Sequence, residues 1–257
     1  MPAIDLDGVA LHHEATGQGP TTLVLVHGSG GSSAVWAHQL SGLADVARVV
    51  APDLPGHGRS GGGAPAAIDE SVEIVRRLLD ALGLARAVVG GHSMGGAVAQ
   101  AFALAHPDRV TGLVLVGTGA RLKVLPSIFE ALEKDYAAGV RLVTDLAVGP
   151  SASAELKDSI YRLTLATPYR VTAADFGACH VFDVIERLAT ITAPTLVVVG
   201  RDDQLTPPKY AEFLRTRIAG ARLAVIPGAG HYVQLERPAE TTAVLREFLL
   251  SLAEGIR

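Results

Sequence analysis

The sequence predicts an α/β fold, a mostly parallel, doubly wound sheet whose strands alternate with helices. First, apolar runs rich in valine and leucine recur along the chain, as at 22–26, 110–116 and 194–200. Strands buried on both faces of a parallel sheet have this composition. Second, segments with helical periodicity lie between most of these runs, and strands that alternate with helices form parallel sheets.

The composition predicts one large domain with a sizeable core, because 49% of the 257 residues are hydrophobic. The net charge of −4 and the lack of a basic run argue against nucleic acid or an anionic membrane as partner. No apolar stretch reaches the ~20 residues of a membrane-spanning helix. Residues 1–5 lack the charged and apolar regions of a secretory signal. We therefore expect a cytoplasmic protein. Its oligomeric state is left open.

The only cysteine is Cys179, which excludes an internal disulfide and a cysteine-based zinc site. No glycine-rich turn or adjacent base marks it as a nucleophile. We expect it to be a small buried side chain. Nothing in the sequence indicates a metal or an organic cofactor, and we expect neither.

The first third of the chain is predicted to begin with an antiparallel hairpin. Residues 4–14 alternate around Asp7-Gly8, a strong signal for a hairpin turn. His12 and His13 are neighbours in a strand and point to opposite faces, so we expect surface histidines and not a metal pair. The elements expected next are the strand 22–26, the helix 33–43, the strand 48–51 and the helix 68–82.

The regular alternation stops between about residues 120 and 189. Apolar stripes at helical spacing are broken there by Pro126, Gly139, Pro150 and Pro168. We expect residues 120–189 to form a helical cap inserted over the carboxyl edge of the sheet, with 1–119 and 190–257 forming the core domain. The elements expected after the cap are the strand 194–200, the helix 208–218, the strand 222–226 and the helix 238–252.

The chain is organised around Gly91-His92-Ser93-Met94-Gly95, a G-x-S-x-G pentapeptide between an apolar run and a good helix former. Strand, sharp turn and helix are the context of a nucleophile elbow. The turn forces Ser93 into a strained backbone, and Gly91 and Gly95 leave the space that it needs. The Met94 amide, at a helix N-terminus, is aimed at any oxygen that becomes negative beside the serine.

A second glycine-rich loop, His27-Gly28-Ser29-Gly30, follows the strand 22–26. Ligand sites in such sheets lie beyond the carboxyl ends of the strands. We expect the Ser29 amide to be a second oxyanion donor beside that of Met94. The loop lacks the continuation of a phosphate-binding motif. His27 is expected to brace the loop. His57 is a candidate base, but His231 fits that role better, so we expect His57 to anchor the loop that follows the next strand.

Two further residue types complete the chemistry that a serine nucleophile needs. Its hydroxyl requires an imidazole to take the proton, and the imidazole requires a carboxylate on its other nitrogen. His231 lies in a late glycine-flanked loop, and Asp202 and Asp203 directly follow the strand 194–200. These positions make Ser93, one of the two aspartates and His231 the candidate catalytic residues.

In these motifs the sequence resembles the α/β-hydrolase superfamily, in its esterase, lactonase and cofactor-free haloperoxidase branch. The resemblance rests on the loops at 27–30 and 53–60, the elbow, the run 200–207 and Gly230-His231. The order serine, acid, histidine is also that of the superfamily. Similar proteins read G-x-x-D followed by a proline, which implies that Asp203 and not Asp202 is the acid.

The resemblance implies a serine hydrolase that acts on small-molecule esters, with a small or medium apolar acyl group. The alternatives are a lactonase for enol-lactones or acyl-lactones, a cofactor-free perhydrolase, and a ligand receptor or signalling protein on a hydrolase scaffold. Dehalogenases and epoxide hydrolases of this fold have aspartate at the position of Ser93. Carbon–carbon bond hydrolases usually have tryptophan where Tyr232 follows His231, which weakens that alternative.

Overall fold

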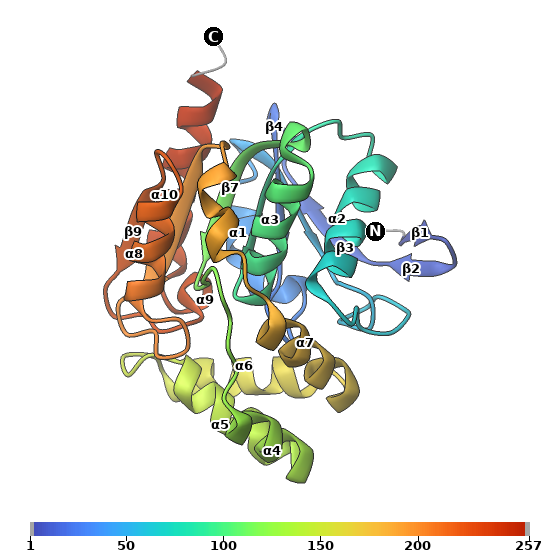
Figure 1. Ribbon diagram of the computed structural model, residues 1–257, viewed down its shortest axis with the longest axis vertical. Helices are drawn as coiled ribbons and strands as arrows, with labels where there is room; N and C mark the ends of the chain where they lie inside the picture. The colour runs from blue at the N-terminus through green and yellow to red at the C-terminus, as the bar shows by residue number, and fades with distance from the viewer. Residues whose placement is uncertain (1–2, 255–257) are drawn as a thin grey trace.

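A seven-stranded sheet forms the centre of the computed structural model, which describes residues 3–254 (Figure 1). The strand order is β3-β5-β4-β6-β7-β8-β9, and every neighbouring pair is parallel except β3 with β5. The strands are β3 (His13–Thr16), β4 (Thr21–Val26), β5 (Ala47–Pro52), β6 (Ala87–His92), β7 (Val110–Val116), β8 (Thr195–Gly200) and β9 (Arg222–Ile226). The predicted mostly parallel α/β sheet is confirmed.

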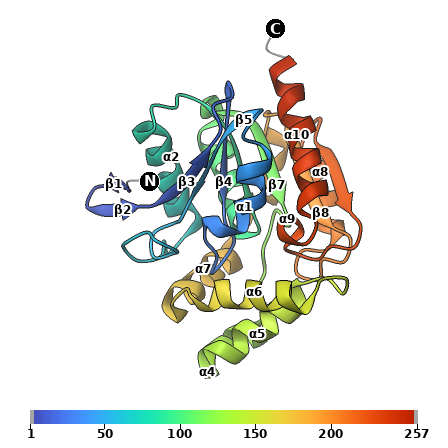
Figure 2. The ribbon, with the colours of Figure 1, turned by 180° about the vertical axis from the view of Figure 1, so that it is seen from behind.

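Helices cover both faces of this sheet. Along β4, Leu23 and Leu25 belong to one apolar cluster, whereas Val24 and Val26 belong to the other, because successive side chains point to opposite faces. The helices α2 (Ile68–Ala81), α3 (Met94–Ala105) and α8 (Pro208–Arg217) pack on the Val24 side. On the other side lie α1 (Ala37–Gly42) and α10 (Pro238–Glu254), which Figure 2 shows in front of the sheet. The helix expected over 33–43 begins as a 3₁₀ turn, η1 (Ser33–Trp36).

The N-terminal hairpin is shorter than predicted. Strands β1 (Ile4–Leu6) and β2 (Val9–Leu11) pair with each other around Asp7 and Gly8, which both have positive φ. The chain then continues into β3, which joins the main sheet.

The expectation that His12 and His13 lie on the surface is wrong. Both are buried, since His13 pairs with Pro52 of β5 and the His12 amide donates to Ser60 Oγ in the loop above. The sequence prediction for the chain's start rests partly on residues 1–2, which lie outside the described residues.

The helices α4 (Pro126–Lys134), α5 (Tyr136–Ala147), α6 (Ala154–Leu165) and α7 (Tyr169–Val181) lie together at the carboxyl ends of the strands (Figures 1 and 2). We call them the α4–α7 layer. Asp135 and Ser153 cap α5 and α6 through their side chains. A small apolar cluster of Ile128, Leu132 and Val140 packs within the layer. The chain returns to β8 through a 3₁₀ helix, η3 (Ile185–Thr190).

Candidate active site

Ser93 lies in the turn between β6 and α3, with φ 54° and ψ −114°. A positive φ is costly for a residue with a side chain and persists only where the surroundings enforce it. Here a Cβ on Gly91 would lie 2.3 Å from the Gly95 backbone, and one on Gly95 would lie 2.2 Å from Val26 O. The three backbone segments are therefore closer than side chains allow. The predicted strained elbow is present.

Hydrogen bonds hold the elbow on both sides of Ser93. Its amide donates to Val116 O at 2.9 Å, and Thr118 Oγ1 donates to its carbonyl at 2.8 Å. The preceding residue, His92, is buried and donates from Nε2 to His231 O at 2.9 Å. Burial lowers the pKa of His92 to about 3, so its ring is neutral at physiological pH. Its Nδ1 atom has no partner among the described residues.

Asp203 and His231 are in direct contact. His231 Nδ1 donates to Asp203 Oδ2 at 2.9 Å, and Thr206 Oγ1 donates to the same oxygen at 2.8 Å. The amides of Leu205 and Thr206 donate to Asp203 Oδ1 at 2.9 and 2.8 Å. Burial opposes ionisation of this carboxyl, but the charge of His231 and these hydrogen bonds outweigh it and lower its pKa. The neighbouring Asp202 is half-buried, and within residues 3–254 its carboxylate bonds to no other residue.

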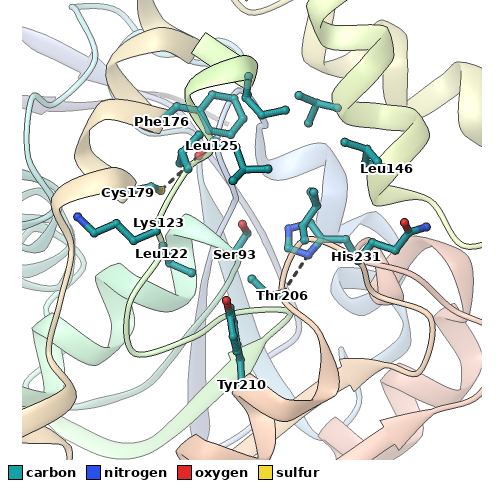
Figure 3. Close-up of a pocket in the computed structure, with 16 residues that line it drawn as sticks. Ser93, Leu122, Lys123, Leu125, Leu146, Phe176, Cys179, Thr206, Tyr210 and His231 are labelled. Atoms are coloured by element: carbon teal, nitrogen blue, oxygen red, sulfur yellow. Dashed lines mark hydrogen bonds between the residues drawn. The ribbon is translucent and has the colours of Figure 1, made fainter. Parts of the chain in front are cut away.

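Ser93 and His231 line one cavity of about 260 Å³ beneath the α4–α7 layer, as Figure 3 shows. Because Nδ1 of His231 is bonded to Asp203, Nε2 is the ring nitrogen left for a further partner. Within residues 3–254, Ser93 Oγ and His231 make no direct hydrogen bond. Such bonds are often long before a substrate binds.

The amides of Ser29 and Met94, the two predicted oxyanion donors, lie in the loop after β4 and at the start of α3. Met94 is the first residue of α3, and the first amides of a helix have no acceptor within it. Ser29 lines the cavity in the loop after β4. Among the described residues, neither amide donates to a protein acceptor.

His27 and His57 hold the loops around the cavity, as predicted. His27 Nδ1 donates to Gly28 O at 2.8 Å, and its Nε2 accepts from the Leu54 amide at 3.1 Å. This pattern requires the neutral ring, and burial lowers the pKa of His27 to about 3. His57 lies 2.8 Å from Asp175 of α7, and the two side chains are fully buried.

Two buried carboxylates at the site escaped the sequence analysis. Asp175 accepts from His57 and from the Gly30 amide. Glu236, in the short helix α9 (Val233–Glu236), accepts from the amides of Gly149, Gly230 and Tyr232 at 2.8, 2.9 and 3.1 Å. Its pKa is raised by burial, which these three hydrogen bonds oppose without overcoming it. Within the described part of the chain, Asp175 bonds only to residues far along the sequence, and Glu236 bonds only to backbone amides, so no side-chain motif marks either one.

The rest of the cavity wall is mostly apolar. Cys179 is buried as predicted, with Sγ 3.6 Å from Ser29 Oγ, and burial raises the pKa of its thiol to about 12. Most of the apolar lining comes from the α4–α7 layer and the segment leading into it: Leu122, Val124, Leu125, Ile128, Val143, Leu146 and Phe176.

Within residues 3–254 no group of three histidine, cysteine or acidic side chains is placed to hold a metal ion. In the same range no helix is both long and apolar enough to cross a membrane.

The family model for the alpha/beta hydrolase fold matches residues 21–238. The chain belongs to the alpha/beta hydrolase family. A curated relative, the pimeloyl-[acyl-carrier protein] methyl ester esterase of Nitrosomonas europaea, is 32% identical over 246 residues. That alignment covers 89% of this chain and 95% of the relative.

Solved structures of hydrolases superpose closely on this alpha/beta hydrolase. A thermophilic esterase is 37% identical with a TM-score of 0.88 and covers 97% of both chains. An enzyme described as degrading N-acyl homoserine lactones is 32% identical with a TM-score of 0.86, covering 96% of this chain and all of its own. These three relatives are thus two esterases and an enzyme that degrades lactones.

Proposed function

We propose that this alpha/beta hydrolase cleaves carboxylic esters through an acyl-enzyme formed on Ser93. The observation that carries the proposal is that Ser93, Ser29 and His231 line one cavity. The Asp203–His231 contact supports it, because a carboxylate on Nδ1 leaves Nε2 as the proton acceptor that a serine hydroxyl requires.

In the proposed mechanism, Ser93 Oγ attacks the ester carbonyl while His231 Nε2 takes its proton. The amides of Ser29 and Met94 donate to the oxygen that becomes negative. His231 then gives its proton to the leaving alcohol, and the acyl group stays on Ser93. A water molecule, deprotonated by His231, attacks the acyl-enzyme, and His231 returns that proton to Ser93 Oγ as the acid leaves. Asp203 stabilises the His231 imidazolium in both half-reactions, and its lowered pKa keeps it ionised.

The cavity supports a small or medium apolar acyl group as the substrate feature that is recognised. Its volume of about 260 Å³ and its lining of leucine, valine, isoleucine and phenylalanine match such a group. We also propose that residues 120–189 act as the cap of this site, because the α4–α7 layer and the segment leading into it supply most of that lining.

Lactone hydrolysis is the second candidate function. A lactone is a cyclic ester, so the same residues would open it, and the alcohol would remain attached to the acyl group. The observation that favours it is the 32% identical relative described as degrading N-acyl homoserine lactones.

The test is turnover of p-nitrophenyl esters from acetate to laurate, with Ser93→Ala beside the wild type. We expect an optimum at short or medium acyl chains, and a kcat lower by about 10⁴-fold or more in Ser93→Ala. Near-native activity in Ser93→Ala would contradict the proposal. Turnover of lactones without turnover of any linear ester would favour the second candidate.

A further inference from the structure

Two side chains, one from α7 and one from the connection between α6 and α7, form hydrogen bonds with Gly30 in the loop that carries Ser29. Asp175 Oδ2 accepts from the Gly30 amide at 2.7 Å, and Thr167 Oγ1 donates to the Gly30 carbonyl at 2.9 Å. Asp175 and Thr167 are both buried. Gly30 has a φ of +64°, a conformation that side chains disfavour. The peptide units on both sides of Gly30 are thus fixed from outside the core sheet.

The peptide unit before Ser29 is fixed from the opposite side. Its carbonyl, Gly28 O, accepts from His27 Nδ1 at 2.8 Å and from the Gly31 amide at 3.0 Å. The direction of the Ser29 N–H therefore depends on two anchors. One anchor is His27 within the core. The other is the pair of hydrogen bonds from Asp175 and Thr167 to Gly30.

His57 fixes Asp175 in turn, and its hydrogen bonds define its charge. Its Nδ1 lies 3.1 Å from Pro55 O, which can only accept, and its Nε2 lies 2.8 Å from Asp175 Oδ2. Both ring nitrogens therefore donate, which requires the imidazolium. Burial lowers the pKa of His57, but the hydrogen bond and charge of Asp175 outweigh burial and raise it. The result is a buried ion pair that joins α7 to the loop after β5.

We propose that Asp175 and Thr167 are positioning residues for the oxyanion site, and that they aim the Ser29 amide at the substrate oxygen through Gly30. The inference rests on the proposed function, because it gives a role to the Ser29 amide that only oxyanion chemistry uses. It assigns the α4–α7 layer a part in transition-state binding, in addition to lining the cavity.

Asparagine at position 175 cannot replace the carboxylate. A single oxygen, Oδ2, accepts from both the Gly30 amide and His57. If the amide oxygen of asparagine takes that place, the His57 cation loses its counter-charge. If the amide nitrogen takes it, two N–H donors face each other at Gly30. Either arrangement weakens the hydrogen bonds that hold Gly30 in place.

The experiment compares Asp175→Asn and Thr167→Val with two matched variants of the same layer. Asp158→Asn alters an exposed carboxylate that pairs with Arg141 and Arg162. Thr144→Val removes a buried hydroxyl that donates to its own helix at Val140 O. The readouts are kcat and KM on the best p-nitrophenyl ester, and the inhibition constant of a trifluoromethyl ketone. The adduct of that ketone with a serine carries an oxyanion. Thermal melting checks that each variant is folded.

We expect Asp175→Asn to lower kcat by about 10- to 100-fold with little change in KM, since loss of a whole oxyanion donor costs about 10²–10³. Ketone affinity should weaken by a similar factor. Thr167→Val should show the same pattern at about 3- to 10-fold, and it decides the question if Asp175→Asn does not fold. The two matched variants should stay within about 2-fold of wild type in both readouts, because neither residue touches Gly30.

Folded Asp175→Asn and Thr167→Val proteins with wild-type kcat and ketone affinity would overturn the inference and leave the proposed function intact. A rise in KM alone would also overturn it, since that result indicates a role in substrate binding only. A wild type that neither hydrolyses esters nor binds the ketone would contradict the proposed function itself, and the inference would fall with it.

Discussion

The serine elbow and the two loops that face it are held in different ways. Around Ser93, backbone packs on backbone, and glycines at 91 and 95 leave no space for a Cβ. The Ser29 and His231 loops are held by hydrogen bonds from buried carboxylate and hydroxyl side chains. Asp175 and Thr167 hold the first loop, and Glu236 holds the second.

This difference links the α4–α7 layer to the loops and not to the elbow. At the end of α5, Ala147 O accepts from the His231 amide at 2.6 Å, and the Gly149 amide shares Glu236 with Gly230. At the other end, α7 holds Gly30 through Asp175. Displacing the layer would therefore break contacts at both loops and leave the elbow in place.

The largest effect is expected in the elbow. In Gly95→Ala the new methyl group would lie 2.2 Å from Val26 O, and neither backbone segment can move away. We expect a loss of about 3 kcal/mol or more in the free energy of unfolding, or failure to fold. Urea unfolding measures it. Gly177→Ala is the matched control, because nothing lies within 4 Å of its Cβ position in α7. Alanine should raise stability there by up to about 1 kcal/mol. If the two variants are equally stable, close backbone packing is not what holds the elbow.

The next largest effect is expected at the two neighbouring aspartates. Asp203→Asn should lower kcat by about 10³- to 10⁴-fold, because asparagine neither fixes the His231 tautomer nor stabilises its cation. Asp202→Asn should remain within a few-fold of wild type, since its carboxylate does not contact His231. Steady-state kinetics on one ester compares them. The reverse ranking would exchange their roles.

A smaller effect is expected at Glu236, which holds the His231 loop. Glu236→Gln places an NH₂ group where a carboxylate oxygen accepts backbone amides, so at least one N–H is left without an acceptor. We expect kcat to fall by about 10-fold or more, with KM changed less. Exposed Glu240 in α10 provides the control, as Glu240→Gln should leave kcat unchanged. If both variants behave as wild type, the His231 loop does not need this carboxylate.

The last effect is that of pH on the free energy of unfolding. The pKa of His27 and of His92 is about 3 in the folded chain, below the ordinary 6.5. Their stabilising contribution is complete above pH 6.5 and is lost as the pH falls toward 3, because the unfolded chain binds protons first. Each should cost about 2 kcal/mol between pH 7 and pH 5. His57 acts in the opposite sense, since its pKa is raised.

Urea unfolding at pH 7 and pH 5 tests this with His27→Asn, which keeps a donor for Gly28 O. Its stability should fall by about 2 kcal/mol less than that of wild type over this range. Exposed His38→Asn should follow the wild type. If all three proteins lose the same free energy of unfolding between pH 7 and pH 5, protonation of His27 does not cause the loss.

The same contrast explains which features the sequence predicts. The elbow is local: Gly91, Ser93 and Gly95 lie within five residues, and their steric demands can be derived from the pentapeptide alone. The valine-rich strands are predictable for a similar reason, since burial on both faces requires a continuous apolar run.

Asp175 and Glu236 were missed because their partners are distant or are backbone amides. Asp175 meets His57, 118 residues away, and Glu236 meets Gly149, 87 residues away. A lone acidic residue in a helix pattern is ordinarily a solvated one. The error at His12 and His13 has the same origin, because His12 bonds to Ser60, 48 residues further along the chain, and His13 pairs with Pro52 of β5.

The central claim is that Ser93 carries the acyl group, and trapping that intermediate tests it most directly. The protein would be mixed with a p-nitrophenyl ester, quenched in acid within the first turnovers, digested and mapped by mass spectrometry. A fluorophosphonate would serve as a stable probe of the same serine. We expect the acyl group and the phosphonate on the peptide that contains Ser93, and neither on Ser93→Ala. Continued hydrolysis with no adduct on that peptide, or an adduct on another residue, would contradict the account.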